Sequence, residues 1–382
     1  MYKSIVDGLS GLTLGVQYLG TQGLPNIIML IVAAVLLYLA IRKGVEPLLL
    51  LPIGFGCVLV NLPLSELMEA GGVLRFFYDI GIATELFPLL IFIGIGAMTD
   101  FGPLLENPKI LFFGAAGQFG IFLTLILALL LGFTQLEAVC IGIIGACDGP
   151  TSIYVTSQYA PHLLAPISVA AYSYMALVPI IQPPIMKFLT TEKERTVRMP
   201  MTQSSVSKTT KLLFPIVVTL VTGLIAPKGL PLMGMIMLGN FMKESGVVER
   251  LSKSSENEIA NMVTLFLGLA IGGTMEGHAF LKAETLLIFG LGFLAISLDT
   301  VGGVLLGKLM YVLSGGKINP LIGAAGISAY PMAARVVQSQ GMRYDKRNFL
   351  LMYAMGANTG GQVGSVMAAA IMLSVLKGMG LI

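Results

Sequence analysis

Long apolar segments recur along almost the whole chain, and they limit the possible fold more than any other feature. A helix needs about 20 mostly apolar residues to cross a bilayer. The candidates for full spans are 24–41, 110–133, 163–189, 212–226, 286–313 and 349–376. Charged residues make up 11% of the chain and its mean hydropathy is +0.87, whereas about 25% of the residues in soluble proteins are charged. We therefore expect an all-α polytopic membrane protein.

Other apolar segments are too short to cross a membrane. They are 47–62, 86–99, 136–146, 230–242, 262–275 and 321–329. Several end at a glycine, a proline or a charge, and their length is typical of half-helices or re-entrant hairpins.

The longest polar stretch, 190–211, reads TTEKERTVRMPMTQSSVSKTTK and carries a cluster of lysines and arginines. Short loops rich in Lys and Arg stay on the cytoplasmic side, so this loop is predicted to be cytoplasmic. Its Ser and Thr content predicts a linker without a helix. The loop divides the chain into an N-terminal membrane half, 1–189, and a C-terminal membrane half, 212–382.

The two halves resemble each other in order and composition. PLLIFIGIGAMTDFGPLLENP at 88–108 corresponds to PLMGMIMLGNFMKESGVVERL at 231–251, and GACDGPTSIYVTSQ at 145–158 to GISAYPMAARVVQSQ at 326–340. Gly- and Pro-interrupted apolar segments at equivalent places point to the binding site of an inverted-repeat transporter. Ordinary scatter of Gly and Pro in membrane helices is the alternative. The expected architecture is two inverted repeats with broken helices and re-entrant hairpins.

Asp148 is the strongest candidate for a functional residue. It follows an apolar run and directly precedes Gly149 and Pro150. A carboxylate at bilayer depth costs roughly 2.5–3.5 kcal/mol and normally faces a partner or a cavity. Pro150 breaks the helix and frees carbonyl groups. Together with the hydroxyls of Thr151 and Ser152 they predict an all-oxygen site for a hard ion such as sodium. A simple helix cap is the alternative.

Two further segments carry polar groups at membrane depth. In the last span, GANTGGQVGSVMAAA contains Asn358, Thr359, Gln362 and Ser365, which are ion ligands or else part of a small-residue packing face. Arg335, after the second break, suits a planar anion, with interfacial snorkelling as the alternative.

Tyrosines and carboxylates supply the remaining candidates. Tyr172 and Tyr174 lie two apart in AAYSYMALVP, so at most one is expected to face the site, with interfacial anchoring as the alternative. Asp100 and Glu106 either line a gate or are solvated, and Asp299 is a weaker candidate of the same kind.

Several classes of function are disfavoured by the sequence. The net charge of +3 gives no nucleic-acid footprint. His162 and His278 have no partner at metal-ligand spacing, and the GxxxxGK spacing at 302–308 is followed by Leu309 in place of the Ser or Thr of an ATP site.

The chain resembles the beta subunits of sodium-pumping biotin-dependent decarboxylases from about residue 20 onward. The resemblance rests on AMTDFGPLLENP, GACDGPTSIY, SVAAYSYMALVPIIQPPIMK, GISAYPMAARVVQ and ANTGGQVGSV. It implies a membrane subunit that decarboxylates carboxybiotin and exports sodium. Members of this family act on oxaloacetate, methylmalonyl-CoA, glutaconyl-CoA or malonate.

The resemblance also implies cofactors, partners and roles for residues. Sodium is the ion, and biotin arrives on another subunit. The expected partners are a carboxyltransferase alpha subunit, a biotin carrier subunit and a small gamma or delta membrane subunit, around a homo-oligomeric core in the bacterial cytoplasmic membrane. The family's carboxylate corresponds to Asp148, its tyrosine to Tyr174, and its late-helix polar residues to the segment with Asn358 and Ser365. Carboxybiotin is expected near Tyr174, held by Arg335.

A second function class fits the same features without the family motifs. A secondary transporter that couples sodium or protons to an anionic solute also uses inverted repeats, broken helices and a buried carboxylate. A third possibility, a membrane scaffold without transport, leaves Asp148 unexplained.

Overall fold

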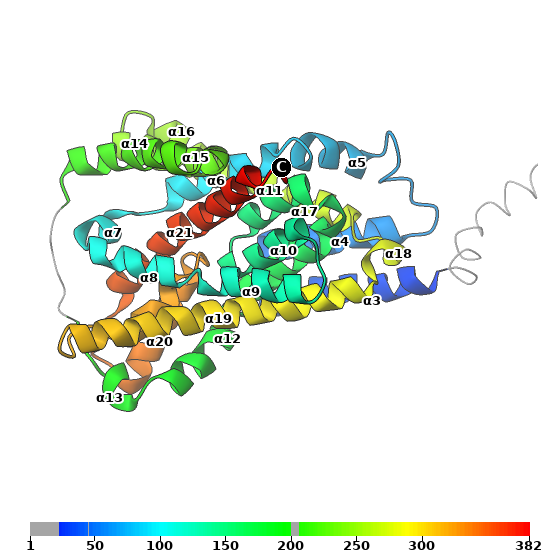
Figure 1. Cartoon of the computed structure of the whole chain (residues 1–382). Helices are drawn as coiled ribbons and strands as arrows, with labels where there is room; N and C mark the ends of the chain where they lie inside the picture. The colour runs from blue at the N-terminus through cyan, green and yellow to red at the C-terminus, as the bar shows by residue number, and fades with distance from the viewer. Residues whose placement is uncertain (1–22, 45, 200–205) are drawn as a thin grey trace, which may run out of the picture.

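The computed structural model describes residues 23–44, 46–199 and 206–382, and within these ranges the regular structure is helical with no strand. In this part of the chain five helices are long and apolar enough to span a membrane, or up to seven if each of two bent pairs counts as one span. In Figure 1, α14 (Lys208–Ile225) and α19 (Ala283–Leu313) run along the length of the molecule, and α21 (Leu351–Gly378) crosses between them at a slant. The expected polytopic all-α architecture is confirmed.

Most of the expected full spans are observed as long helices. Uninterrupted helices are α3 (Leu24–Lys43), α14 (Lys208–Ile225), α19 (Ala283–Leu313) and α21 (Leu351–Gly378). The expected span 110–133 begins with the 3₁₀ turn η2 (Pro108–Ile110) and is interrupted at Gly117 and Gln118, between α8 (Leu111–Ala116) and α9 (Phe119–Leu130). The segment at 163–189 forms α12 (Leu164–Leu189), which bends by 61° between Met175 and Leu177. Pro179 accounts for this position, because a helical proline clashes with the carbonyl four residues earlier.

The short apolar segments form short helices, as expected. They are α4 (Pro47–Asn61), α6 (Leu86–Met98), α10 (Gln135–Gly142), α15 (Leu230–Ser245) and α17 (Ala260–Gly273). The helix α5 (Val73–Phe77) with η1 (Tyr78–Ile82) forms a bent pair with α6, at 62°.

The two Pro-containing breaks meet inside the protein. In the first, α10 continues as η3 (Ile143–Ala146) and the chain then turns into α11 (Gly149–Tyr159). In the second, η7 (Pro320–Gly326) leads through five irregular residues into α20 (Met332–Tyr344). The backbone N–H of Ser328 donates to the carbonyl of Ala146 at 3.1 Å, which joins the two tips directly.

The first pair of matched segments also meets in space. Helices α6 and α15 pack so closely that a Cβ added to Gly96 would lie 1.9 Å from the Ile236 carbonyl oxygen, and one added to Gly239 would lie 2.0 Å from that of Ile93. Only glycine permits this approach of two backbones. Neighbouring positions do not establish an inverted symmetry, so the repeat stays a prediction.

The loop at 190–211 corrects one expectation. It contains a one-turn helix, α13 (Glu192–Arg195), and its last residues begin α14, whereas we expected no helix. The reason is a capping box: Thr191 and Glu194 each accept from the other's backbone N–H, which stabilises a helix start. Residues 1–22 and 200–205 lie outside the described part of the chain.

Candidate functional site

Asp148 lies at the point where the first break turns into α11. Cys147 before it has a left-handed backbone, with φ at 52°, and Gly149 and Pro150 occupy the first turn of the helix. Asp148 is therefore the N-cap residue. Its Oδ1 accepts from the backbone N–H of Thr151 at 3.3 Å, and its Oδ2 accepts from the Thr151 hydroxyl at 2.6 Å.

A second hydroxyl reaches the same carboxylate oxygen from the last span. Ser365 Oγ, on α21, lies 3.4 Å from Asp148 Oδ2 and 2.9 Å from the carbonyl of Gln362. Asp148 is 8% exposed and Ser365 is fully buried. The fold thus brings together two of the expected ligand groups, Thr151 and Ser365, on one oxygen of the expected carboxylate.

Two other expected ligands do not touch the carboxylate. The hydroxyl of Ser152 points to backbone oxygens, those of Asp148 at 3.1 Å and Ile143 at 3.5 Å. The amide nitrogen of Asn358 donates to the carbonyl of Ile327 at 2.6 Å, while its oxygen is buried without a hydrogen-bond partner. Asn358 therefore ties α21 to the second break and keeps one free acceptor atom.

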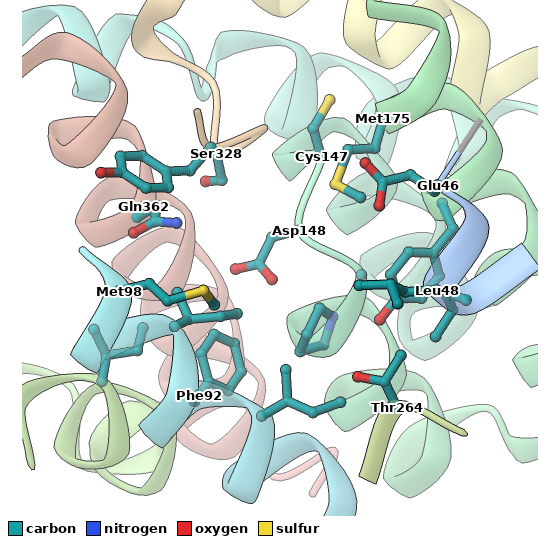
Figure 2. Close-up of a pocket in the computed structure, with 18 of the residues that line it drawn as sticks. Glu46, Leu48, Phe92, Met98, Cys147, Asp148, Met175, Thr264, Ser328 and Gln362 are labelled. Carbon is teal, nitrogen blue, oxygen red and sulfur yellow. The ribbon is translucent and has the colours of Figure 1, made fainter. Parts of the chain in front are cut away.

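A cavity of about 380 Å³ opens beside Asp148 (Figure 2). Both breaks contribute to its lining, and the walls are completed by α4, α6, α12, α15, α17, α21 and the π-helical turn η6 (Ser255–Ile259). Its charged lining residues within the described chain are all acidic: Asp148, Glu46 and Glu256. Most of the remaining surface is apolar, so a group that enters leaves bulk water and meets few polar atoms.

The two tyrosines of α12 take different positions. Tyr172 lines the cavity, and a Cβ added to Gly149 would lie 2.0 Å from its ring. Tyr174 does not line the cavity; its hydroxyl donates to the carbonyl of Phe289 on α19 at 2.5 Å. Only one of them faces the site, as expected, but in this conformation it is Tyr172, whereas the resemblance points to Tyr174. The role of Tyr174 stays a prediction.

Arg335 and two of the carboxylates lie outside the cavity. Arg335 is exposed on α20, one turn after Pro331, which does line the cavity. Asp100 is exposed and accepts from the backbone N–H of Gly102 at 2.9 Å, and Glu106 is half-buried at the end of α7 (Gly102–Glu106). Neither carboxylate lines the cavity beside Asp148, and a role at a gate stays a prediction.

Asp299 is fully buried in the middle of α19. Its Oδ1 accepts from the backbone N–H of Gly120, at the start of α9, and its Oδ2 has no hydrogen-bond partner. It does not line the cavity beside Asp148.

Several lining residues were missed by sequence reasoning. Ser328, at the tip of the second break, donates its hydroxyl to the carbonyl of Gly361 at 2.9 Å. Its position in the second half, equivalent to the first break, was a usable signal. Glu46 and Glu256 carried no such signal, because each lies in a short polar segment, three residues after a lysine.

The side-chain atoms at Asp148 that could ligate an ion are oxygen atoms, from the carboxylate and from the hydroxyls of Thr151 and Ser365. Among the described residues, no group of three or more His, Cys, Asp or Glu side chains is placed to hold a metal ion. The arrangement suits a hard monovalent cation held by one carboxylate and neutral oxygens.

Comparison with known proteins gives the family. Residues 25–376 match the family model described as Na+-transporting oxaloacetate decarboxylase beta subunit. The chain is 50% identical to the methylmalonyl-CoA decarboxylase subunit beta of Propionigenium modestum, over 98% of this chain and 100% of that protein. It is 52% identical to the glutaconyl-CoA decarboxylase subunit beta of Acidaminococcus fermentans, over 92% and 94%. With the oxaloacetate decarboxylase beta chain of Klebsiella pneumoniae the identity is 47%, over 96% and 98%.

These matches confirm the resemblance seen in the sequence. They do not favour the alternative, a secondary transporter of an anionic solute, since the family couples a decarboxylation to sodium transport. The chain belongs to the family of beta subunits of sodium-transporting decarboxylases.

Proposed function

We propose that this chain decarboxylates carboxybiotin, presented by a partner subunit, and uses the reaction to export sodium through the cavity beside Asp148. The observation that carries the proposal is the pair of hydroxyls, from Thr151 and Ser365, on one oxygen of a buried carboxylate at the edge of that cavity. The family of the chain supplies the reaction class.

Sodium binds to the Asp148 carboxylate. The hydroxyl oxygens of Thr151 and Ser365 are within reach as further ligands, since each already contacts Oδ2. The amide oxygen of Asn358, which has no hydrogen-bond partner, becomes a further sodium ligand when α21 moves. Ser152 supports the turn at Asp148 through its contacts with backbone oxygens. A proton competes with sodium for the same carboxylate.

Carboxybiotin reacts in the apolar part of the cavity. The bond between its ring nitrogen and the carboxylate carbon breaks, CO2 leaves, and the electron pair stays on nitrogen. Loss of neutral CO2 from an anion is favoured where water is excluded. The Tyr174 hydroxyl donates its proton to that nitrogen, and the tyrosine regains one taken up from outside. Because the hydroxyl now contacts Phe289, this step requires α12 to shift. Arg335 holds the carboxylate as carboxybiotin enters.

The orientation follows from the basic loop at 190–211, which lies on the cytoplasmic side of the bacterial inner membrane in this proposal. The relatives are named for methylmalonyl-CoA, glutaconyl-CoA and oxaloacetate decarboxylases. A carboxyltransferase alpha subunit of one of these specificities transfers the carboxyl group to a biotin carrier subunit. A small gamma or delta subunit and further copies of this chain complete the complex.

Two inverted halves, 1–189 and 212–382, provide the alternating access. The two breaks touch at their tips through Ser328 and Ala146, so a movement of one changes the position of the other and of Asp148 between them. Moving one sodium ion against the membrane potential costs about 2.3 kcal/mol per 100 mV, which decarboxylation provides.

The test uses sealed vesicles that contain the complex in one orientation. We expect added carboxybiotin to release CO2 and to drive sodium into the vesicle lumen, with each process dependent on the other. Sodium movement that needs an external solute gradient and ignores carboxybiotin would instead support a secondary transporter and end this proposal.

A further inference from the structure

Helix α20 exposes a basic face that begins at the cavity. Its buried face consists of small and aliphatic residues, among them Ala333, Ala334 and Val337. The exposed positions include Arg335, Ser339 and Arg343, and their spacing of four residues places them on one side of the helix. The helix contains no Asp or Glu.

The basic face continues past the end of the helix. Lys346 and Arg347 are exposed, and Asp345, the acidic residue between them and the helix, forms an ion pair with Arg198. The Arg198 guanidinium lowers the pKa of the Asp345 carboxyl through its hydrogen bond, so that residue stays charged and paired. We call Arg335, Arg343, Lys346 and Arg347 the α20 basic face.

The opposite end of the face reaches the proposed reaction site. Tyr330 and Pro331, the two residues before α20, line the cavity beside Asp148. A helix of 13 residues is about 20 Å long, so positive charge extends from the outer surface almost to the cavity. Glu46 and Glu256 lie among the lining residues, and an anion therefore gains most by approaching along α20.

A rigid platform supports the outer end of α20. The guanidinium of the buried Arg195, on α13, donates to the carbonyl of Lys187 at 2.7 Å and lies 4.7 Å from the centre of the Tyr344 ring. The backbone carbonyl of Arg195 accepts from the side-chain amides of Asn319 and Asn348, each at 3.0 Å. Figure 1 shows α13 and α20 at the same end of the molecule. Surfaces that are ordered before binding lose less entropy when a partner docks.

We propose that the α20 basic face is the docking surface for an acidic patch on the soluble protein that carries carboxylated biotin. This inference rests on the proposed function and extends it to the surface that the carrier recognises. Charge complementarity selects this partner: the four members of the face, Arg335, Arg343, Lys346 and Arg347, are all basic, and the face ends beside Pro331, which lines the cavity where carboxybiotin reacts in this proposal. Binding of anionic lipid headgroups is the competing explanation for exposed basic residues near a membrane.

The experiment measures binding of a purified biotinylated carrier domain from a methylmalonyl-CoA decarboxylase to the chain in vesicles of neutral lipid. One variant carries Arg343→Glu and Arg347→Glu; the matched control carries Lys109→Glu and Arg250→Glu, two exposed basic residues elsewhere. Arg343→Gln with Arg347→Gln serves in case the reversal disturbs the end of α20. We expect the affinity to fall at least about tenfold for the α20 variants, to stay at the wild-type value for the control, and to weaken with salt for the wild type.

A second readout separates docking from chemistry. Decarboxylation of free carboxybiotin should be unchanged in the Arg343 and Arg347 variants, whereas kcat/KM for the carboxylated carrier should fall with the affinity. Equal carrier binding by wild type and variants would overturn the docking proposal, as would a loss that appears only in vesicles with anionic lipid. Wild-type chain that binds the carrier but decarboxylates neither substrate would refute the proposed function and leave the docking surface standing.

Discussion

Asp148 and Asp299 are both buried carboxylates among apolar helices, yet their surroundings differ. Asp148 is the N-cap residue of a helix that starts inside the protein, borders a cavity and accepts from two hydroxyls. Asp299 lies within a continuous helix, accepts from the backbone N–H of Gly120 and borders no described cavity. A Cβ added to Gly145 would lie 2.7 Å from its free oxygen, so the neighbouring backbone closes that side.

The difference shows what makes a buried carboxylate suitable for an ion. Burial alone makes the charged form costly, and both residues are buried. Of the two, Asp148 lines the cavity described above and has two hydroxyl oxygens close enough to replace part of an ion's water. Asp299 instead caps the start of α9, where the helix is interrupted and its first N–H groups need an acceptor.

The largest effect is expected for Asp148→Asn. The amide keeps the shape of the side chain but removes the charge, which attracts a cation at about 4 Å by roughly 4 kcal/mol at an effective dielectric constant near 20. We expect sodium-dependent decarboxylation to fall by about a thousandfold while the protein still inserts and folds. The rate of CO2 release measures this. Turnover near the wild-type level would remove Asp148 from the mechanism.

Tyr174→Phe is expected to have the next largest effect. It removes only the hydroxyl, and loss of a general acid typically lowers a rate about a hundredfold. Half-saturation by sodium should change much less. Tyr172→Phe is the matched control; phenylalanine keeps the ring that lines the cavity beside Gly149, so the expected loss is at most a few-fold. If Tyr172→Phe proves the more damaging change, the residue that faces the cavity is the proton donor and Tyr174 has a packing role.

The hydroxyls on Asp148 should tune the affinity for sodium. A hydrogen bond to a charged group contributes about 1.5–3 kcal/mol, so Thr151→Val, at 2.6 Å, is expected to raise the half-saturating sodium concentration about tenfold. Ser365→Ala, at 3.4 Å, should raise it only about threefold. Ser152→Ala is the control, since that hydroxyl contacts backbone oxygens. A shift for Ser152→Ala as large as that for Thr151→Val would contradict this assignment of ligands.

The smallest effect on sodium is expected for Asp299→Asn. The amide oxygen can still accept from Gly120, but its nitrogen becomes a buried donor without an acceptor, which costs about 1–3 kcal/mol. The variant should therefore unfold at a lower temperature while its half-saturating sodium concentration stays the same. A clear shift in sodium dependence with unchanged Tm would make Asp299 a second ion site and remove the contrast with Asp148.

Local sequence signals predicted the parts of this site that depend on neighbouring residues. Asp148 before Gly149 and Pro150 predicted the break, the helix start and the contact with Thr151, because all lie within one turn. The contact of Ser365 with Asp148 spans more than 200 residues, and only the expected role of the last span pointed toward it.

Other parts could not be derived from local patterns. The face of α12 that meets the cavity depends on the packing of this bent helix, so the spacing of Tyr172 and Tyr174 alone could not select between them. Glu46 reaches the cavity because the chain turns into α4 with a left-handed backbone at that residue, with φ at 37°. The helix α13 was predictable from its Thr191–Glu194 capping box, and the Ser and Thr content of the loop obscured it.

Equilibrium binding of radioactive sodium to the purified protein, without carboxybiotin, tests most directly whether Asp148 holds the ion. We expect saturable binding to the wild type and to Asp299→Asn with the same affinity, and no saturable binding to Asp148→Asn. Retention of wild-type sodium affinity by folded Asp148→Asn would show that the ion binds elsewhere and that Asp148 is not its ligand.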